Sequence, residues 1–307
     1  MSSSASAVRP AGTRPAPQRQ ASPPSTLRAY GALTKPGITR LVVVTAGVSW
    51  FLGAPEFDGL ALINLLFGTA LVASGANAFN QILERRADAL MRRTADRPLP
   101  SGRLGIAEAL IFSTALSFIG VVHLYFLINP LTALVVLVSL LSYTLVYTPM
   151  KKRTWWATLA GAVPGALPAL AGWAAATHTL SRDGWLLFAI VFVWQMPHFF
   201  ALGWMYREDY ARGGFRLLSS IDPTGARTAN QTLLYILLLL PVSVLPAWSG
   251  LMSWVYAAGA LALGLAFMAP AITLWRDLAR GHARRVFVAS ILYLPALLAL
   301  MVVDRVL

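Results

Sequence analysis

The sequence contains no cysteine, which excludes disulfide bonds and any chemistry that needs a thiolate. Charge is also scarce: charged residues make up 12% of the 307 residues, whereas a soluble protein would carry roughly 25%. Hydrophobic residues account for 57% of the chain. Because so little of the chain could face water, the composition predicts an all-α polytopic membrane protein with one helical domain.

Long apolar stretches dominate the sequence. Nine of them are long enough to cross a bilayer as helices, and most of the links between them are short. They lie near residues 38–54, 59–80, 105–127, 131–148, 156–177, 185–205, 232–249, 252–275 and 286–303. We therefore expect nine transmembrane helices in a lipid bilayer.

Basic residues exceed acidic ones, and the net charge is +13. If the N-terminus lies inside, every Lys and Arg except Arg182 and Arg305 belongs to the inner segments. Basic residues beside membrane spans report orientation first, so the charge does not indicate nucleic-acid binding. We expect a multi-pass protein of the bacterial cytoplasmic (inner) membrane, with its N-terminus and active site cytoplasmic. The mitochondrial inner membrane is the alternative.

Residues 1–30 differ in composition from the rest of the chain. They are rich in Ser, Ala, Pro and Arg and lack the apolar core of a secretory signal. They contain no acidic residue, as in an organelle transit peptide. We interpret them as a disordered basic tail, and residues 31–307 as the nine-helix domain.

The most distinctive polar stretch follows the second apolar segment. Asn80, Glu84 and Asp88 are spaced i, i+4, i+8, which places their oxygen-bearing side chains on one helix face in steps of about 6 Å. Five arginines, including Arg93 and Arg97, crowd the same stretch. Carboxylates beside arginines are suited to hold a divalent cation together with a polyphosphate. A solvated helix end with local Glu–Arg pairs is the structural alternative.

A second acidic and basic stretch, residues 206–214, ends the sixth apolar segment on the same face. It carries Glu208 and Asp209 between arginines. Two such clusters facing one another could hold Mg²⁺ ions that clamp a diphosphate and neutralise a departing pyrophosphate. Between the fourth and fifth segments, Lys152 and Arg153 either contact the diphosphate or only report orientation.

Histidine is rare, and His198 is the one that lies within an apolar segment near its inner end. An imidazole at that depth must find a polar partner. It either packs with a hydrogen bond or contacts a polar or iron-bearing substrate.

At this point several stretches resemble one family, the UbiA-type intramembrane prenyltransferases, in the form found in their protoheme farnesyltransferase branch. The resemblance covers roughly residues 30–300. It rests on residues 33–36 (LTKP), 80–99 (Asn80-x3-Glu84-x3-Asp88 through Arg97-Pro98-Leu99), 147–154, 161–173, 194–199 and 207–215. Departures from the usual family pattern occur at Glu84, Glu208, Ala157 and Arg216.

The resemblance implies nine helices around a central cavity that opens sideways to lipid. It implies Mg²⁺ as the cofactor and farnesyl diphosphate and heme b as substrates, with farnesylation of a heme vinyl group to give heme O. Heme A synthase or terminal oxidase assembly factors are possible partners. The residue roles that follow are Mg²⁺ ligation by Asn80, Glu84, Asp88 and Asp209; diphosphate contact by Arg93, Arg97, Lys152 and Arg153; and acceptor contact by His198 and Tyr210.

Three alternatives stay open from the residues alone. A related prenyltransferase could act on an aromatic acceptor such as hydroxybenzoate. A transporter would carry ionisable residues in the middle of its spans, where this chain has almost none. An oxidase assembly factor would not need the acidic residues of the first stretch.

Overall fold

The computed structural model describes residues 26–307, and nine helices in this range are long and apolar enough to cross a membrane. Three short helices connect or precede them: α1 (Thr26–Leu33), α9 (Arg207–Arg212) and α10 (Leu218–Ile221). The long helices are α2 (Pro36–Gly53), α3 (Gly59–Asp88), α4 (Ile106–Leu127), α5 (Pro130–Leu141), α7 (Ala157–Thr177), α8 (Arg182–Met205), α11 (Ala226–Ser249), α12 (Trp254–Arg276) and α13 (Arg280–Val306). Helix α5 continues through a π-helical turn, Ser142–Tyr147, into α6 (Thr148–Met150), which completes the fourth span.

The nine expected spans are confirmed, and the protein is an integral, multi-pass membrane protein of the all-α class. Three bounds differ from the expectation by six residues or more. Helix α3 reaches Asp88, and α11 and α13 begin at Ala226 and Arg280, six residues before the apolar segments do. Hydropathy detects only the apolar part of a span, whereas a helix continues wherever its backbone and polar side chains find partners.

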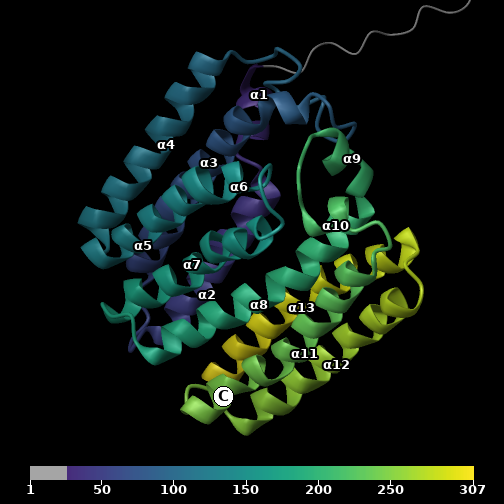
Figure 1. The fold of residues 1–307 in the computed structure, drawn as a ribbon. Helices are drawn as coiled ribbons and strands as arrows, with labels where there is room; N and C mark the ends of the chain where they lie inside the picture. The colour runs from purple at the N-terminus through teal and green to yellow at the C-terminus, as the bar shows by residue number, and fades with distance from the viewer. Residues whose placement is uncertain (1–25) are drawn as a thin grey trace, which may run out of the picture.

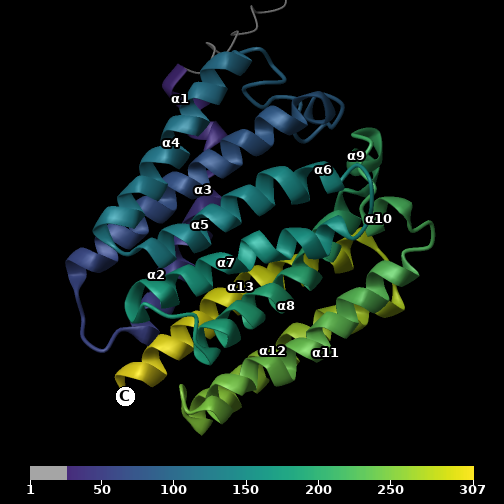
Figure 2. The same ribbon diagram turned by 60° about the vertical axis from the view of Figure 1, so that its left-hand side comes forward.

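The long helices lie side by side in both ribbon views (Figure 1 and Figure 2). Helix α7 contacts α2 and α5 on one side and α8 on the other, and α8 in turn packs against α11 and α13. Most of α7 is buried, and its sequence is rich in Ala and Gly. Small residues let neighbouring backbones approach closely, so α7 can occupy the centre of the bundle.

Proline inside α7 is compensated by a neighbouring helix. Pro168 has no N–H to donate to the carbonyl of Pro164, one helical turn earlier. The Ser139 hydroxyl donates to that carbonyl at 2.9 Å. A side chain of α5 therefore satisfies a backbone group that would otherwise be unpaired in the apolar interior.

The contact between α2 and α7 depends on Gly172. A Cβ added there would lie 2.0 Å from the backbone oxygen of Ala46. We expect Gly172→Ala to destabilise the protein by about 3 kcal/mol, because backbone cannot yield as a side chain can. Thermal unfolding in detergent, followed by tryptophan fluorescence, would measure the loss. Gly37→Ala is the control, since nothing lies within 4 Å of a Cβ at Gly37; equal unfolding temperatures for both variants would contradict the prediction.

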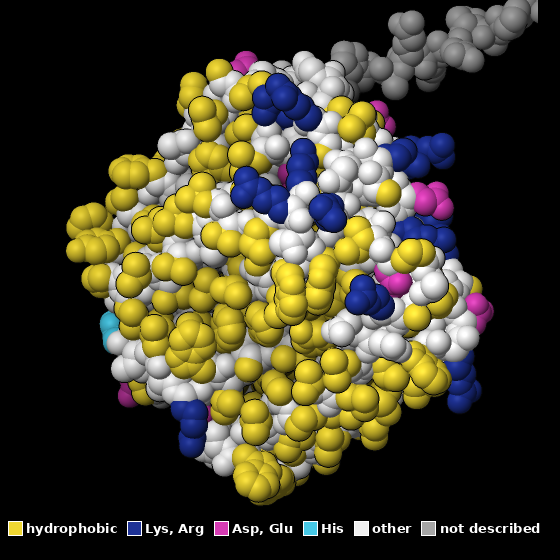
Figure 3. Space-filling model, in the orientation of Figure 1, with side chains coloured by type: hydrophobic (Ala, Val, Ile, Leu, Met, Phe, Trp, Pro, Cys, Tyr) yellow, Lys and Arg dark blue, Asp and Glu magenta, His cyan; other side chains and the backbone are white. Residues whose placement is uncertain are grey.

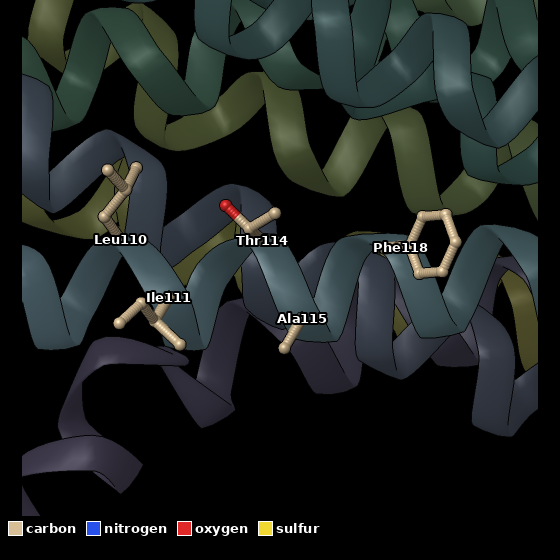
Figure 4. Close-up of a pocket in the computed structure, with 5 residues that line it drawn as sticks. All are labelled: Leu110, Ile111, Thr114, Ala115 and Phe118. Atoms are coloured by element: carbon tan, nitrogen blue, oxygen red, sulfur yellow. The ribbon is translucent and has the colours of Figure 1, made fainter.

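The surface divides by polarity. Figure 3 shows most of the Lys and Arg side chains in the upper and right-hand parts of the molecule, while hydrophobic side chains predominate in the centre and on the left. A shallow hollow of about 470 Å³ on α4 is lined by Leu110, Ile111, Thr114, Ala115 and Phe118, as Figure 4 shows. Ile111 and Phe118 are largely exposed. This hollow carries only one polar group, the Thr114 hydroxyl, so it fits a lipid-facing surface rather than a catalytic site.

The N-terminal tail expected over residues 1–30 falls mostly outside the described residues, which start at Thr26. Residues 26–30, the last five of the expected tail, belong to α1, which contacts α3. The division into a tail and a nine-helix domain stays a prediction.

Candidate active site

The turn between α1 and α2 is held by two amide side chains of α3. The Asn77 amide donates to the Thr34 carbonyl and to the Thr39 hydroxyl at 3.3 and 3.2 Å. The Gln81 amide donates to the carbonyls of Ala32 and Leu33, both at 3.1 Å. These bonds satisfy carbonyls at the end of α1 that have no partner within the helix. They fix the turn against the helix face that also carries the predicted acidic residues.

Lys35 occupies the left-handed region of that turn, with φ at 46°. The conformation is uncommon for a residue with a side chain, and Pro36 follows directly. In this conformation the Lys35 ammonium donates to Asn80 Oδ1 at 2.7 Å. The anchored turn therefore delivers a cation to the first residue of the predicted set.

Asn80, Glu84 and Asp88 are all buried on α3, with exposed fractions of 1%, 6% and 0%. As the spacing predicted, the three belong to one helix; in addition, each contacts a basic residue that lies outside that helix. Besides the Lys35 contact, Lys151 Nζ lies 2.6 Å from Glu84 Oε1, and Arg97 Nη1 lies 2.8 Å from Asp88 Oδ2. The other carboxylate oxygen, Asp88 Oδ1, is buried without a hydrogen-bond partner among the described residues. We use the name ladder site for the six residues Lys35, Asn80, Glu84, Asp88, Arg97 and Lys151.

Three basic side chains and two carboxylates meet in the ladder site. Burial lowers the pKa of Lys35 to about 7, and the nearby charge of Arg97 adds to the effect. Burial alone would also lower the pKa of Lys151, but the Glu84 carboxylate outweighs it and the net shift is upward. Lys151 therefore stays charged, and the excess of basic groups suits an anion.

Lys151 is positioned by the π-helical turn. Thr148 accepts from the Asn80 amide at 3.3 Å and donates to the Tyr143 carbonyl at 2.8 Å. The Lys151 ammonium lies 4.4 Å from the centre of the Tyr147 ring, within cation–π range. A π-helical turn shifts the register of a helix and often occurs at functional sites. Here it brings both Thr148 and Lys151 to the α3 face.

The second predicted stretch lies beside the first. Asp209 in α9 pairs with Arg212 and accepts the backbone N–H of Arg92 at 3.2 Å. Burial disfavours its ionised form, but these hydrogen bonds outweigh burial and lower the pKa of Asp209. The two views agree that α9 lies against the connection after α3 (Figure 1 and Figure 2).

Further contacts join the polar connections that follow α3, α6 and α8. The Arg93 guanidinium lies 3.5 Å from the Tyr210 hydroxyl and 5.0 Å from the centre of the Tyr206 ring. The backbone N–H of Arg216 donates to the Lys151 carbonyl at 2.7 Å. Arg93, Arg97, Asp209 and Tyr210 therefore all belong to the region around the ladder site.

Sequence reasoning missed Lys35 and Lys151, and it singled out Lys152 and Arg153 instead. In the structure Lys152 and Arg153 are exposed, while Lys151 is buried against Glu84. Three adjacent basic residues look alike in the sequence, so no local signal singled out Lys151. Lys35 had none that a local pattern could supply, since its contact with Asn80 spans 45 positions.

Magnesium ligation by Asn80, Glu84, Asp88 and Asp209 stays a prediction. In the range 26–307, no three His, Asp or Glu side chains form a group that could hold a metal ion. Each of the three carboxylates has its own basic partner. The donor chemistry nevertheless fits Mg²⁺, which takes oxygen ligands and commonly uses one or two carboxylates with phosphate oxygens and water. Asp88 Oδ1 is a buried oxygen with a lone pair to offer.

His198 belongs to α8, and its side chain contacts α13. Its Nδ1 lies 2.8 Å from the Ser290 hydroxyl, and its ring lies beside those of Trp194 and Phe287. The recorded hydrogen bond of His198 is therefore to α13 and not to a ladder-site residue. The acceptor roles of His198 and Tyr210 stay predictions.

Comparison with known proteins gives one family and several close relatives. The family model described as UbiA prenyltransferase family matches residues 41–296. A protoheme IX farnesyltransferase of Solibacter usitatus is 45% identical over 289 residues, covering 91% of this chain and 99% of that protein. One from Salinibacter ruber is 45% identical over 276 residues, covering 90% and 98%.

Solved structures share the fold at lower identity. A digeranylgeranylglyceryl phosphate synthase structure aligns with a TM-score of 0.73 at 18% identity, covering 92% of this chain and 99% of that one. A UbiA homolog from Archaeoglobus fulgidus, bound to DMAPP and Mg²⁺, aligns with a TM-score of 0.69 at 14% identity, covering 89% and 99%. These likenesses establish the helical architecture.

Proposed function

The chain belongs to the UbiA prenyltransferase family, and we propose that it transfers a farnesyl group from farnesyl diphosphate to a vinyl group of heme b, giving heme O. The ladder site carries the proposal: three basic side chains contact its polar residues, two of them buried carboxylates, and within residues 26–307 one oxygen of Asp88 has no hydrogen-bond partner. The names of the relatives support the choice of donor and acceptor. An aromatic acceptor is the rival that the test below separates.

Recognition of the diphosphate follows from the charges. Lys35, Lys151, Arg93 and Arg97 lie around the C-terminal end of α3, where a diphosphate would find donors on several sides. Arginine binds phosphate oxygens through paired N–H groups, and lysine acts as a point charge. Lys152 and Arg153 are exposed at the same end, so we assign them an outer contribution to the electrostatic attraction.

Asn80, Glu84, Asp88 and Asp209 would hold Mg²⁺, which supplies neutralisation of the negative charge on the leaving pyrophosphate. The protein's basic side chains contribute to the same neutralisation. As the allylic C–O bond breaks, its electron pair leaves with the pyrophosphate, and Lys151 and Arg97 stabilise that charge. Because their positions are set by Glu84 and Asp88, little reorganisation is needed at that moment.

The apolar helices protect the reaction from water. The allylic cation is attacked by the π electrons of the heme vinyl group, which forms the new C–C bond. A water molecule then adds at the neighbouring carbon and releases a proton, which completes the hydroxyethylfarnesyl group. Exclusion of water until that step prevents hydrolysis of the cation. His198 and Tyr210 are the proposed contacts to the acceptor.

We place the active site on the cytoplasmic side of a bacterial inner membrane. The support is the distribution of Lys and Arg, which is almost wholly on the side of the ladder site when the N-terminus lies inside. Heme O made there would be released to a heme A synthase or to oxidase assembly, which are the proposed partners.

Mass spectrometry of hemes tests the activity. Cells competent to assemble a terminal oxidase but lacking their own enzyme would be compared with and without this protein. We expect heme O only when the protein is present. Membranes would also be supplied with hydroxybenzoate and farnesyl diphosphate; a prenylated aromatic product without heme O would contradict the proposal and favour the rival acceptor.

Removal of divalent metal is expected to stop the reaction. Chelation of purified enzyme with EDTA should lower heme O formation at least about a hundredfold, because metal neutralisation of a leaving group supplies several kcal/mol. Excess Mg²⁺ should restore the rate. Turnover that persists after chelation and dialysis would show that the basic residues of the ladder site suffice alone.

A further inference from the structure

The His198 ring is fixed in one orientation by its surroundings. It lies beside the rings of Trp194 and Phe287, with centroids 5.4 and 4.8 Å away and planes inclined by 29° and 33°. The Trp194 indole N–H donates to the Ser290 carbonyl at 2.8 Å, which ties α8 to α13 at the same level. The imidazole therefore has little freedom to turn.

Its tautomer is also fixed. The Ser290 hydroxyl has one hydrogen, and it donates that hydrogen to the Phe287 carbonyl at 2.6 Å. The Ser290 oxygen must then accept from the His198 ring, so Nδ1 at 2.8 Å carries the proton. Nε2 is left with a lone pair, and no hydrogen bond to it is recorded among residues 26–307.

This arrangement is the one that metal-binding histidines use. A histidine that ligates a metal through one nitrogen almost always donates its other N–H to an oxygen, which sets the tautomer and raises the basicity of the ligating nitrogen. Here the oxygen belongs to Ser290, which is fully buried and passes its own hydrogen to a backbone carbonyl.

Two other histidines contact a backbone carbonyl through a ring nitrogen, but they lie elsewhere in the molecule. His123 contacts the Asn64 carbonyl, near the beginning of α3 and far along that helix from Asp88. His282 lies in the first turn of α13 and contacts the Asp277 carbonyl outside the bundle core. His178 ends α7, at the opposite end of that helix from the ladder site. The chain contains no cysteine, so no thiolate competes as a ligand.

We propose that His198 Nε2 is the axial ligand of the heme b iron, and that Ser290 is the positioning residue that holds its tautomer. The proposal rests on the proposed function, because it takes heme b as the acceptor. An iron anchored on α8 fixes the heme in the bundle, so that its reactive vinyl group is presented in a set orientation. Nitrogen ligation leaves the porphyrin edge free to react.

Spectroscopy of the heme-loaded protein tests the ligand directly. Purified protein in lipid nanodiscs would be titrated with ferric heme b and followed by absorption and by electron paramagnetic resonance. We expect a nitrogen-ligated spectrum for the wild type and for His178→Ala, the control. His198→Ala should lose that spectrum, and added imidazole should restore it by filling the vacated space.

Ser290 variants separate positioning from mere packing. Ser290→Ala removes the hydroxyl but keeps His198, and we expect heme affinity to fall about 10- to 100-fold, as for loss of a hydrogen-bond partner to a metal ligand. Ser290→Thr retains a hydroxyl and should recover the wild-type spectrum. If Ser290→Ala and wild type bind heme equally and with one spectrum, the positioning role is wrong.

The inference and the proposed function can fail separately. A wild-type protein that makes heme O but shows the same heme spectrum after His198→Ala overturns the iron ligand and leaves the activity standing. A wild-type protein that makes no heme O overturns the proposed function itself.

Discussion

Replacement of Asp88 by Asn is expected to reduce heme O formation at least about a hundredfold, the scale on which loss of one preorganised charge contact slows a reaction. Asp88 is fully buried, with one carboxylate oxygen on Arg97 and the other unpartnered among the described residues. The amide keeps the shape but removes the charge. It cannot neutralise a metal ion, and it holds Arg97 less firmly.

Asp96→Asn is the matched control, because it makes the same change at an exposed position of the same connection. Thermal unfolding in detergent would establish that both variants are folded, and heme O would be quantified by mass spectrometry in both. Near-normal turnover by a folded Asp88→Asn protein would argue strongly against a role for the ladder site in the reaction.

Lys151→Gln is expected to impair stability and activity together. The change leaves the Glu84 carboxylate, which is 6% exposed, without its cation at 2.6 Å. Loss of one partner of a buried ion pair typically costs about 3–5 kcal/mol, because the remaining charge is uncompensated. We expect a lower unfolding temperature in detergent and a loss of turnover, since Lys151 is also a proposed contact to the diphosphate.

A double variant separates the two effects. Lys151→Gln with Glu84→Gln replaces the ion pair by two neutral amides, which should recover most of the lost stability without recovering turnover. Lys152→Gln is the comparison next in sequence. Its exposed side chain predicts little loss of stability, and its outer contribution to the attraction of the diphosphate predicts a much smaller loss of turnover than that of Lys151→Gln. Equal effects of Lys151→Gln and Lys152→Gln would show that the burial of Lys151 has no functional consequence.

The membrane fold could be predicted almost completely from the sequence. Nine apolar segments became nine spanning helices, because hydropathy is a local property of 20 or so residues. The helical spacing of Asn80, Glu84 and Asp88 was equally local, and it correctly placed three oxygen-bearing side chains together on α3. The family resemblance rested on the same kind of short pattern and is confirmed.

The partners of those side chains could not be predicted in this way. Lys35 meets Asn80 across 45 positions, and Lys151 meets Glu84 across 67. Sequence reasoning chose Lys152 and Arg153 because a basic run looks alike at every position, whereas the π-helical turn before it selects Lys151. The hydroxyl that sets the tautomer of His198 comes from Ser290, 92 positions away.

By itself the sequence determined the nine spans, the helix face that carries the carboxylates and the family, since each depends on residues within one or a few helical turns. Only the tertiary structure decided which cation neutralises which carboxylate and which nitrogen of His198 keeps its lone pair. Those outcomes depend on which helices pack together, because ion pairs and hydrogen bonds act over about 3 Å and join residues that the chain order keeps far apart.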